Sequence, residues 1–260
     1  MVFDFSFVLV ALAALTGAVW GLDHWLFARQ RRERGVSRDP VLVDYSRSFF
    51  PVIVLVLVLR SFLYEPFRIP SDSMMPTLIQ GDFIFVNKWR YGLRLPVLNT
   101  RIVAIGEPQR GDVVVFRKPS EPSIVFIKRL VGLPGDVIQV TGNQVLVNGT
   151  PSQIAAGGLY SGPKSEQYPF SRVGEERLGD ADHAILLDPA RPGLEGEWRV
   201  PPGHFFMMGD NRNNSRDSRF PEVGFVPQHN VIGKAEAIWL SFNPDPGSLL
   251  LWHRMGTGIR

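Results

Sequence analysis

The sequence has 260 residues, which is long enough for one ordinary domain with accessory segments. Hydrophobic residues make up 45% and charged residues 20%, so the chain is too apolar to be a disordered protein. The net charge is only +3 and most of the excess is local, so we expect no nucleic-acid partner. Cysteine is absent, which excludes disulfides, thiolate metal sites and cysteine nucleophiles.

The first apolar run covers residues 5–22 and contains no charged residue. A helix rises 1.5 Å per residue, so this run nearly crosses a hydrocarbon core of about 30 Å. It predicts a first transmembrane segment within residues 1–27. The alternative is a cleavable signal peptide, but such peptides begin with a basic region and this chain begins with MVFD.

The second apolar run, residues 48–59, is short but is flanked by arginines that can reach the membrane interface. It predicts a second transmembrane segment at 45–63, with a buried or interfacial helix as the alternative. We therefore expect residues 28–44 to form a basic cytoplasmic loop, with the chain after residue 63 on the outer side. Six arginines lie between the two apolar runs: Arg29, Arg31, Arg32, Arg34, Arg38 and Arg47.

Beyond residue 63 the sequence is typical of a mostly β domain. Short β-branched runs follow Gly-Asp pairs at 81–82, 111–112 and 135–136, and an Asn-Gly pair at 148–149 predicts a hairpin turn. One or two late strands are expected within 231–242. Residues 150–200 are rich in Gly, Pro and charge and predict a cap subdomain. We expect this cap to be inserted in a β-rich domain that comprises residues 64–149 and 201–260.

Most of the usual catalytic motifs are missing. The sequence has no HExxH, no GxSxG and no glycine-rich phosphate loop, and its five histidines are not at metal-ligand spacing. Residues 209–219, GDNRNNSRDSR, superficially resemble a calcium loop, but Arg212 occupies the third ligand position. We expect a hydrogen-bonded polar turn there, and neither a metal nor a cofactor.

A serine and a lysine remain as candidate catalytic groups. Residues 70–76 place two hydroxyls, on Ser71 and Ser73, between two prolines that stiffen the backbone. Residues 125–131, VFIKRLV, read as a strand whose alternation directs Lys128 and Arg129 to opposite faces. A lysine among apolar neighbours can lose its proton, whereas arginine cannot. The pattern alone also permits an ordinary surface lysine.

Three segments resemble the signature boxes of one protease family in order and spacing: FRIPSDSMMPTL at 67–78 with GD at 81–82, KRLVGLPGD at 128–136, and GDNRNNSRDSR at 209–219. The family is bacterial signal peptidase I, or leader peptidase. The resemblance implies a membrane-bound serine endopeptidase without a cofactor that removes signal peptides after small residues of the Ala-x-Ala type. It further implies a multi-pass protein of the inner membrane with its catalytic domain on the periplasmic side. The implied partners are preproteins and the phospholipid bilayer.

The resemblance also assigns residues. Ser73 is similar to the family's nucleophile, Lys128 to its general base, and Ser215 to the serine that orients the lysine amine. Ser71 matches the hydroxyl that joins the Ser73 amide in the oxyanion hole. The polar support of the third box matches Asp210, Asp217 and Arg219. The shallow pockets for small side chains match Phe67, Ile69, Met74, Leu78, Ile84, Val115, Phe126 and Ile127.

Two positions depart from the family pattern, because Asp72 stands where a small residue is commoner and Asn213 where aspartate is common. With Ser71 and Ser73 turned to the site, we expect the Asp72 carboxylate to point to solvent and to tolerate substitution.

We also expect an apolar membrane-facing patch that includes Trp239, residues 249–251 and Trp252. Two alternatives stay open: another Ser/Lys protease, such as a self-cleaving repressor, and a catalytically silent membrane-anchored β scaffold that binds peptides.

Overall fold

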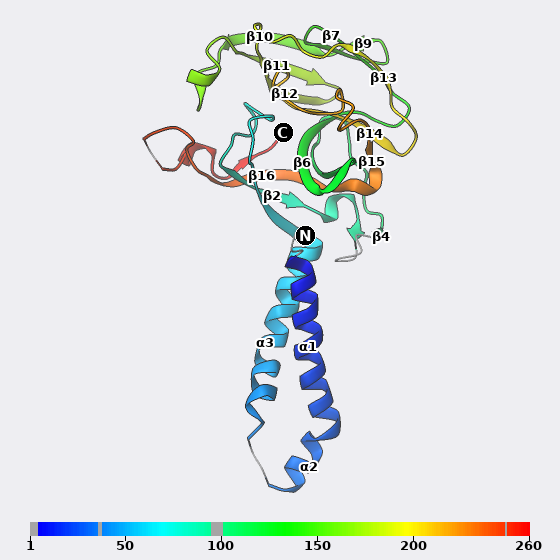
Figure 1. Cartoon of the computed structure of the whole chain (residues 1–260), viewed down its shortest axis with the longest axis vertical. Coiled ribbons are helices and arrows are strands. Elements are labelled where there is room, and N and C mark those ends of the chain that lie inside the picture. The colour runs from blue at the N-terminus through cyan, green and yellow to red at the C-terminus, as the bar shows by residue number, and fades with distance from the viewer. Residues whose placement is uncertain (1–4, 36–37, 95–100, 248) are drawn as a thin grey trace. The chain divides into compact units, whose positions relative to one another are not determined.

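The computed structural model describes residues 5–35, 38–94, 101–247 and 249–260. The chain divides into two compact units. The helical unit comprises Met1–Tyr64 and Gly92–Ala104, and the β unit comprises Glu65–Tyr91 and Ile105–Arg260. The mostly β fold class with two N-terminal apolar helices is confirmed (Figure 1).

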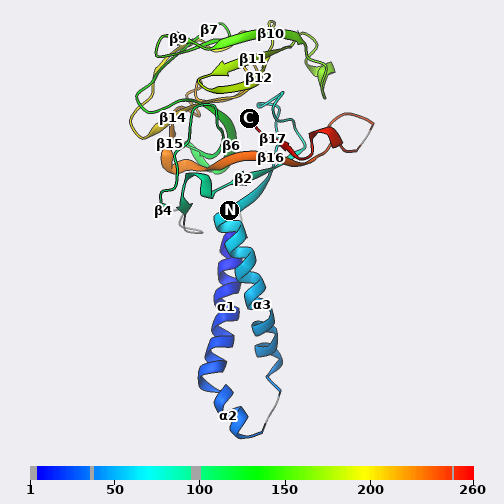
Figure 2. The same cartoon turned by 180° about the vertical axis from the view of Figure 1, so that it is seen from behind.

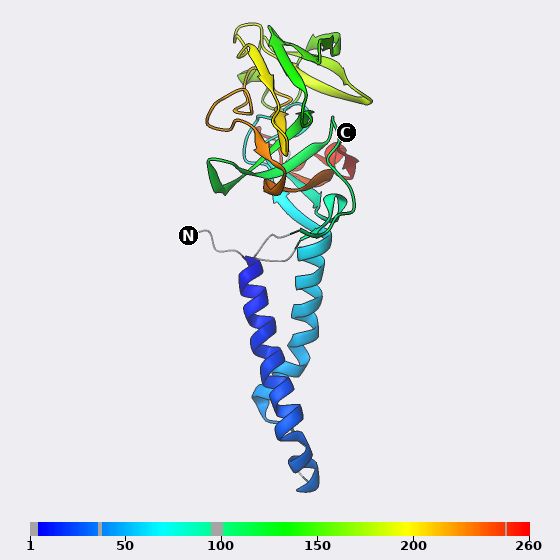
Figure 3. The ribbon, with the colours of Figure 1, turned by 90° about the vertical axis from the view of Figure 1, so that its right-hand side faces the viewer.

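The helical unit contains α1 (Phe5–Leu26), α2 (Ala28–Glu33) and α3 (Val41–Val58), which a π-helical turn (Leu59–Leu63) extends. Figure 3 shows α1 and α3 side by side. The rings of Trp20 and Phe50 lie 5.7 Å apart between them, and a Cβ on Gly17 would come within 2.7 Å of the Phe50 ring. A short pair of strands, β3 (Leu93–Arg94) and β4 (Arg101–Val103), completes this unit.

Both long helices can cross a membrane by length and composition, over Phe7–Leu26 and Val41–Val58. Only 11% of each span is buried within the protein, whereas the core helix of a soluble protein is mostly buried. The outward apolar side chains therefore suit contact with lipid. The second helix begins at Val41, and the expected transmembrane segment at 45–63 stays a prediction. Pro40 immediately precedes this helix, where the missing proline N–H costs no helical hydrogen bond.

The main sheet of the β unit runs in the order β1-β2-β16-β5-β6-β14-β15, with β17 on β16. Its registered strand pairs are antiparallel. The strands are β1 (Tyr64–Arg68), β2 (Asp82–Asn87), β5 (Val113–Lys118), β6 (Glu121–Gly132), β14 (His204–Met208), β15 (Val226–Pro227), β16 (Val231–Ser241) and β17 (Thr257–Gly258). The late apolar run thus forms one long strand, β16, rather than two.

Two small sheets lie together at the end of the β unit farthest from β2 (Figures 1 and 2). One has the order β10-β11-β12 and the other β13-β7-β8-β9. Their strands are β7 (Val137–Thr141), β8 (Gln144–Val147), β9 (Thr150–Pro151), β10 (Gln153–Leu159), β11 (Arg172–Leu178), β12 (Ala181–Leu187) and β13 (Gly196–Arg199). β7 and β8 pair with β13 and β9, so this small sheet also contains strands that precede residue 150. The expected cap at 150–200 stays a prediction.

The three Gly-Asp pairs form turns of one design. Gly81, Gly111 and Gly135 have φ of 101°, 92° and 92°, a region that costs glycine little. In each turn the following aspartate Oδ2 accepts the amide of the residue three positions earlier, at 2.9, 2.9 and 2.6 Å. Asn148 and Gly149 also have positive φ, as the predicted two-residue hairpin between β8 and β9 requires.

Candidate active site

The connection between β1 and β2, residues 69–81, carries Ser71 and Ser73. The backbone closes this connection, because the Ile69 amide donates to the Asp82 carbonyl and the Gly81 amide donates to the Ile69 carbonyl. Met74 and Leu78 are completely buried in the core between β2, β5 and β16. Two buried anchors directly after Ser73 therefore hold its backbone in place.

Lys128 lies on β6, opposite Val114 of β5, and is only 4% exposed. Its Nζ is 2.6 Å from Ser73 Oγ and donates to the Ile127 carbonyl at 2.8 Å. The Phe126 ring centroid lies 5.3 Å from the same nitrogen. The alternative of a surface lysine is excluded by this burial, and the sequence-predicted serine and lysine are in direct contact.

Burial lowers the pKa of Lys128 to about 8, because the low-dielectric surroundings penalise the ammonium form. The charges of Asp217 and Asp210 oppose this shift, and the charge of Arg219 supports it. At pH 7 roughly a tenth of the amine is therefore neutral. A neutral amine next to a serine hydroxyl can accept the hydroxyl proton, which an ordinary lysine does too rarely.

Ser71 Oγ lies 3.4 Å from Ser73 Oγ on the exposed side of the connection. Within the described ranges, the Ser73 amide donates no hydrogen bond to the protein. The Ser71 hydroxyl and the Ser73 amide are thus both close to Ser73 Oγ, and their expected role as oxyanion donors stays a prediction.

The third box, residues 209–219, supports the site from behind. Arg129 forms two hydrogen bonds to the Asp210 carboxylate, at 2.7 and 2.6 Å, and both side chains are fully buried. Thr77 Oγ1 donates to the same carboxylate at 2.5 Å. Burial opposes the negative charge, but the Arg129 charge and these hydrogen bonds outweigh it and lower the pKa of Asp210. Sequence reasoning missed Arg129 as a site residue, although strand alternation had already directed it away from Lys128.

Asp217 and Arg219 form a second buried pair, with two hydrogen bonds of 2.8 Å. The Gly209 amide donates to Asp217 at 3.0 Å, and a Cβ on Gly209 would lie 2.2 Å from Ser215 Oγ and 2.4 Å from the Ser73 carbonyl. Only glycine fits this close approach. Ser215 is buried, but its hydroxyl has no hydrogen-bond partner among the described residues. Its expected contact with Lys128 therefore stays a prediction.

The residues expected to line shallow pockets lie mostly in the core. Phe67 packs against one core cluster, and Phe126 packs against another. The six other side chains are at most 9% exposed and share the first of these clusters: Ile69, Met74, Leu78, Ile84, Val115 and Ile127. They form an apolar layer directly behind the Ser73 connection, so their contact with a substrate stays a prediction.

The two departures from the family pattern are both anchored. The expectation that Asp72 points to solvent was wrong, because its carboxylate pairs with Lys164 at 2.8 Å and the side chain is only 14% exposed. The tertiary fold brings the inserted segment over this position, which the local turn pattern does not encode. Asn213 Oδ1 accepts the Asp188 amide at 2.9 Å, and its Nδ2 donates to the Arg191 carbonyl at 2.6 Å.

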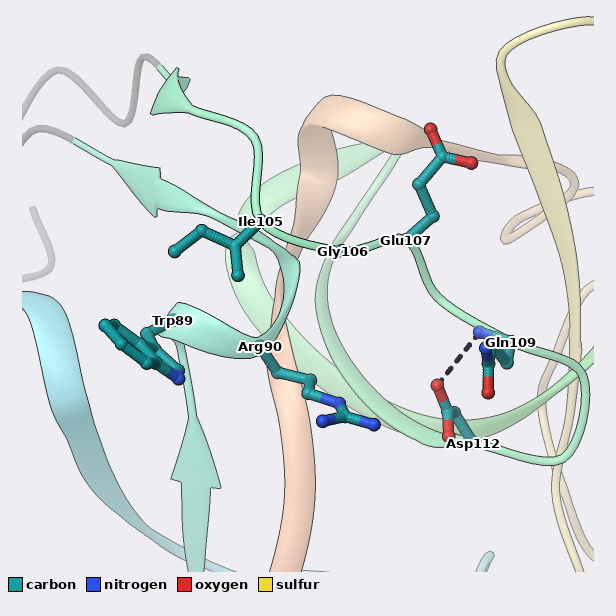
Figure 4. A pocket seen from close by; sticks show the side chains of 7 residues that line it. All are labelled: Trp89, Arg90, Ile105, Gly106, Glu107, Gln109 and Asp112. Atoms are coloured by element: carbon teal, nitrogen blue, oxygen red, sulfur yellow. Dashed lines mark hydrogen bonds between the residues drawn. The ribbon is translucent and has the colours of Figure 1, made fainter.

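A separate cavity of about 280 Å³ is lined by seven residues, including Trp89, Arg90 and Glu107 (Figure 4). Asp112 lies at its edge and accepts hydrogen bonds from Tyr91 and Lys234, so its carboxylate is already used structurally. The cavity contains none of the predicted site residues. Across the described part of the chain, no cluster of three or more His, Asp or Glu side chains could hold a metal.

Comparison with known proteins identifies the family of the chain. The family described as signal peptidase, peptidase S26, matches residues 42–240. A signal peptidase I of Pseudomonas aeruginosa is 46% identical over 274 residues, which cover 95% of both chains. One from Pseudomonas fluorescens is 44% identical with the same coverage. Among solved structures, a signal peptidase I of Enterococcus faecalis V583 is 28% identical with a TM-score of 0.31, covering 50% of this chain and 98% of that one.

Proposed function

The chain belongs to the peptidase S26 family of signal peptidases, and from that premise we propose that Ser73 is its nucleophile and Lys128 its general base. The observation that carries the proposal is the 2.6 Å separation of Lys128 Nζ from Ser73 Oγ at a buried lysine. Neither group does this chemistry well alone, because a serine hydroxyl needs a base and a lysine needs a lowered pKa.

In the proposed reaction Ser73 Oγ attacks the scissile carbonyl of a preprotein while neutral Lys128 takes the hydroxyl proton. The Ser71 hydroxyl and the Ser73 amide donate to the oxyanion that forms. Lys128 then returns the proton to the leaving amine as the C–N bond breaks. Water, deprotonated by Lys128, hydrolyses the acyl ester and releases the signal peptide. This sequence of steps uses protein side chains alone.

The edge of β6 supports a binding mode for the substrate. β14 pairs with β6 only from Arg129 to Gly132, while β5 occupies the other edge. Within the described strands, β6 before Lys128 therefore has one free edge on which an extended peptide can add as a strand. Apolar side chains behind the site then favour small residues at the cleavage position, consistent with Ala-x-Ala specificity. The serine that orients the lysine is proposed to be Ser215.

For location, we propose the bacterial inner membrane, with the arginine-rich segment in the cytoplasm and the β unit on the periplasmic side. Two helices that can span a membrane support this proposal. The β unit also exposes Trp239, Leu249 and Trp252, which suit the membrane interface, whereas Leu251 is partly buried against an apolar cluster. Protease added to spheroplasts should digest the β unit, and full protection would overturn this orientation.

The proposed catalysis is tested with the purified protein in detergent, a preprotein substrate and a Ser73→Ala control. We expect release of a defined signal peptide by the wild type and none by Ser73→Ala. Binding without cleavage would favour a silent peptide-binding scaffold. Self-cleavage with no action on the preprotein would favour another kind of Ser/Lys protease.

A further inference from the structure

Asp72 lies between the two active-site serines, and its side chain contacts the inserted segment. Lys164 Nζ donates to both carboxylate oxygens, at 2.9 and 2.8 Å, and Tyr168 Oη donates to the same carboxylate at 3.2 Å. The side chains of Lys164 and Asp72 are 10% and 14% exposed. Solvent therefore screens this ion pair much less than a surface pair.

Lys164 is itself held in one position. Its backbone has φ of 62°, in the left-handed region, and its amide donates to Asp245 Oδ2 at 2.7 Å. Its ammonium also donates to Gln80 Oε1 at 2.5 Å. A non-glycine residue keeps such a backbone only where its surroundings hold it there. Lys164 is thus a fixed anchor rather than a mobile surface side chain.

Tyr168 provides a second fixed contact. It is 6% exposed and packs with Met75 and Ile79 of the β1–β2 connection. Its hydroxyl accepts a 2.8 Å hydrogen bond from Asn214 Nδ2, which links the inserted segment to the third box. The inserted segment therefore touches the serine-bearing connection through both an ion pair and an apolar cluster.

The third box holds the backbone of Asp72 and Ser73. Asn211 Nδ2 donates to the Asp72 carbonyl at 3.0 Å, and the Asn211 amide donates to the Ser73 carbonyl at 3.2 Å. Asn211 thus fixes the backbone of Asp72 and Ser73, and Lys164 fixes the side chain of Asp72. Rotation of this short stretch would move Ser71 Oγ and Ser73 Oγ together.

We propose that Lys164 is a positioning residue for the reaction: through Asp72 it fixes the backbone that carries the nucleophile and the oxyanion donor. This inference rests on the proposed function of Ser73. It assigns a role to the inserted segment, which acts as a brace for the site. A displacement near 1 Å at a reacting group can reduce the rate on the order of a hundredfold, so a fixed backbone matters for turnover.

The test compares Lys164→Met, Asp72→Asn and the double variant in the full-length protein with a signal-peptide substrate. We expect Lys164→Met to reduce kcat by about 10- to 100-fold and to change KM by less than about twofold. Because both residues act through one contact, the double variant should be no slower than the slower single variant. Additive losses, or a kcat for Lys164→Met above half the wild-type value, would overturn the inference.

Arg177→Met is the matched control, because Arg177 forms a similar paired contact with Asp182 in the same segment but is exposed. It should keep wild-type kcat, and thermal unfolding should show all variants folded.

If Lys164→Met does not fold, the isosteric Asp72→Asn decides alone: a fivefold or larger loss of kcat supports the inference and an unchanged kcat overturns it. If Ser73→Ala is inactive while Lys164→Met is normal, only this inference fails. Activity in Ser73→Ala would instead overturn the proposed function.

Discussion

Lys128 Nζ lies 2.6 Å from Ser73 Oγ, although 55 positions separate the two residues in the chain. The contact forms because β6 and the β1–β2 connection pack against the same core, and it buries the amine almost completely. Burial gives the lysine its lowered pKa, so position and basicity have a common physical origin.

The first prediction concerns the pH dependence of the reaction. If neutral Lys128 is the base, as proposed, its pKa of about 8 requires kcat/KM to fall about tenfold per pH unit below 8. Lys128→Arg has no neutral form at these pH values and should lose more than nine-tenths of kcat. Initial rates on a peptide substrate between pH 6 and 10 measure the profile. A flat profile from pH 6 to 8 would contradict a lysine base.

The second prediction concerns stability. Below pH 8 Lys128 is charged in both the folded and the unfolded chain, so the folded state bears the full cost of burying the ammonium. As pH rises from about 8 to 10.5, the folded state loses its proton first and gains stability. Lys128→Met should therefore be more stable than wild type at pH 7 by about 3 kcal/mol, with the difference vanishing near pH 10.5. Denaturant unfolding at several pH values measures it, and a difference that does not depend on pH would refute it.

The third prediction concerns the buried pair of Arg129 and Asp210. Asp210→Asn removes one charge and leaves the Arg129 guanidinium buried without its partner, which costs about 3–5 kcal/mol of unfolding free energy. Arg216→Met removes a similar but exposed ion pair with Glu222 and should change stability by less than about 1 kcal/mol. Equal losses in the two variants, measured by denaturant unfolding, would show that burial does not decide the effect.

The fourth prediction concerns Gly209. Gly209→Ala places a Cβ within 2.4 Å of the Ser73 carbonyl, so the backbone of the proposed nucleophile must shift and kcat should fall at least tenfold. Gly158→Ala is the control, because a Cβ there meets nothing within 4 Å and its φ is not in the left-handed region. Steady-state kinetics of both variants test this, and normal turnover by Gly209→Ala would argue against a tightly constrained site.

Features encoded in short stretches of sequence were predicted well. The two apolar runs became α1 and α3, the Gly-Asp pairs became turns with positive φ at glycine, and the Asn-Gly pair became a hairpin. Each depends on hydrophobicity or backbone freedom within a few residues. The pairing of Ser73 with Lys128 was expected from the family resemblance, because the strand pattern alone left a surface lysine open.

Only the tertiary structure decided which distant residues meet. Asp72 pairs with Lys164 across 92 positions, and Arg129 with Asp210 across 81. In the same way, β7 and β8 take their partners from residues 196–199 and 150–151, which a local strand pattern does not specify. Local patterns specify that a side chain is polar or that a segment is extended. Strand order and loop packing specify its partner, and hence whether a carboxylate between two serines reaches solvent or a lysine.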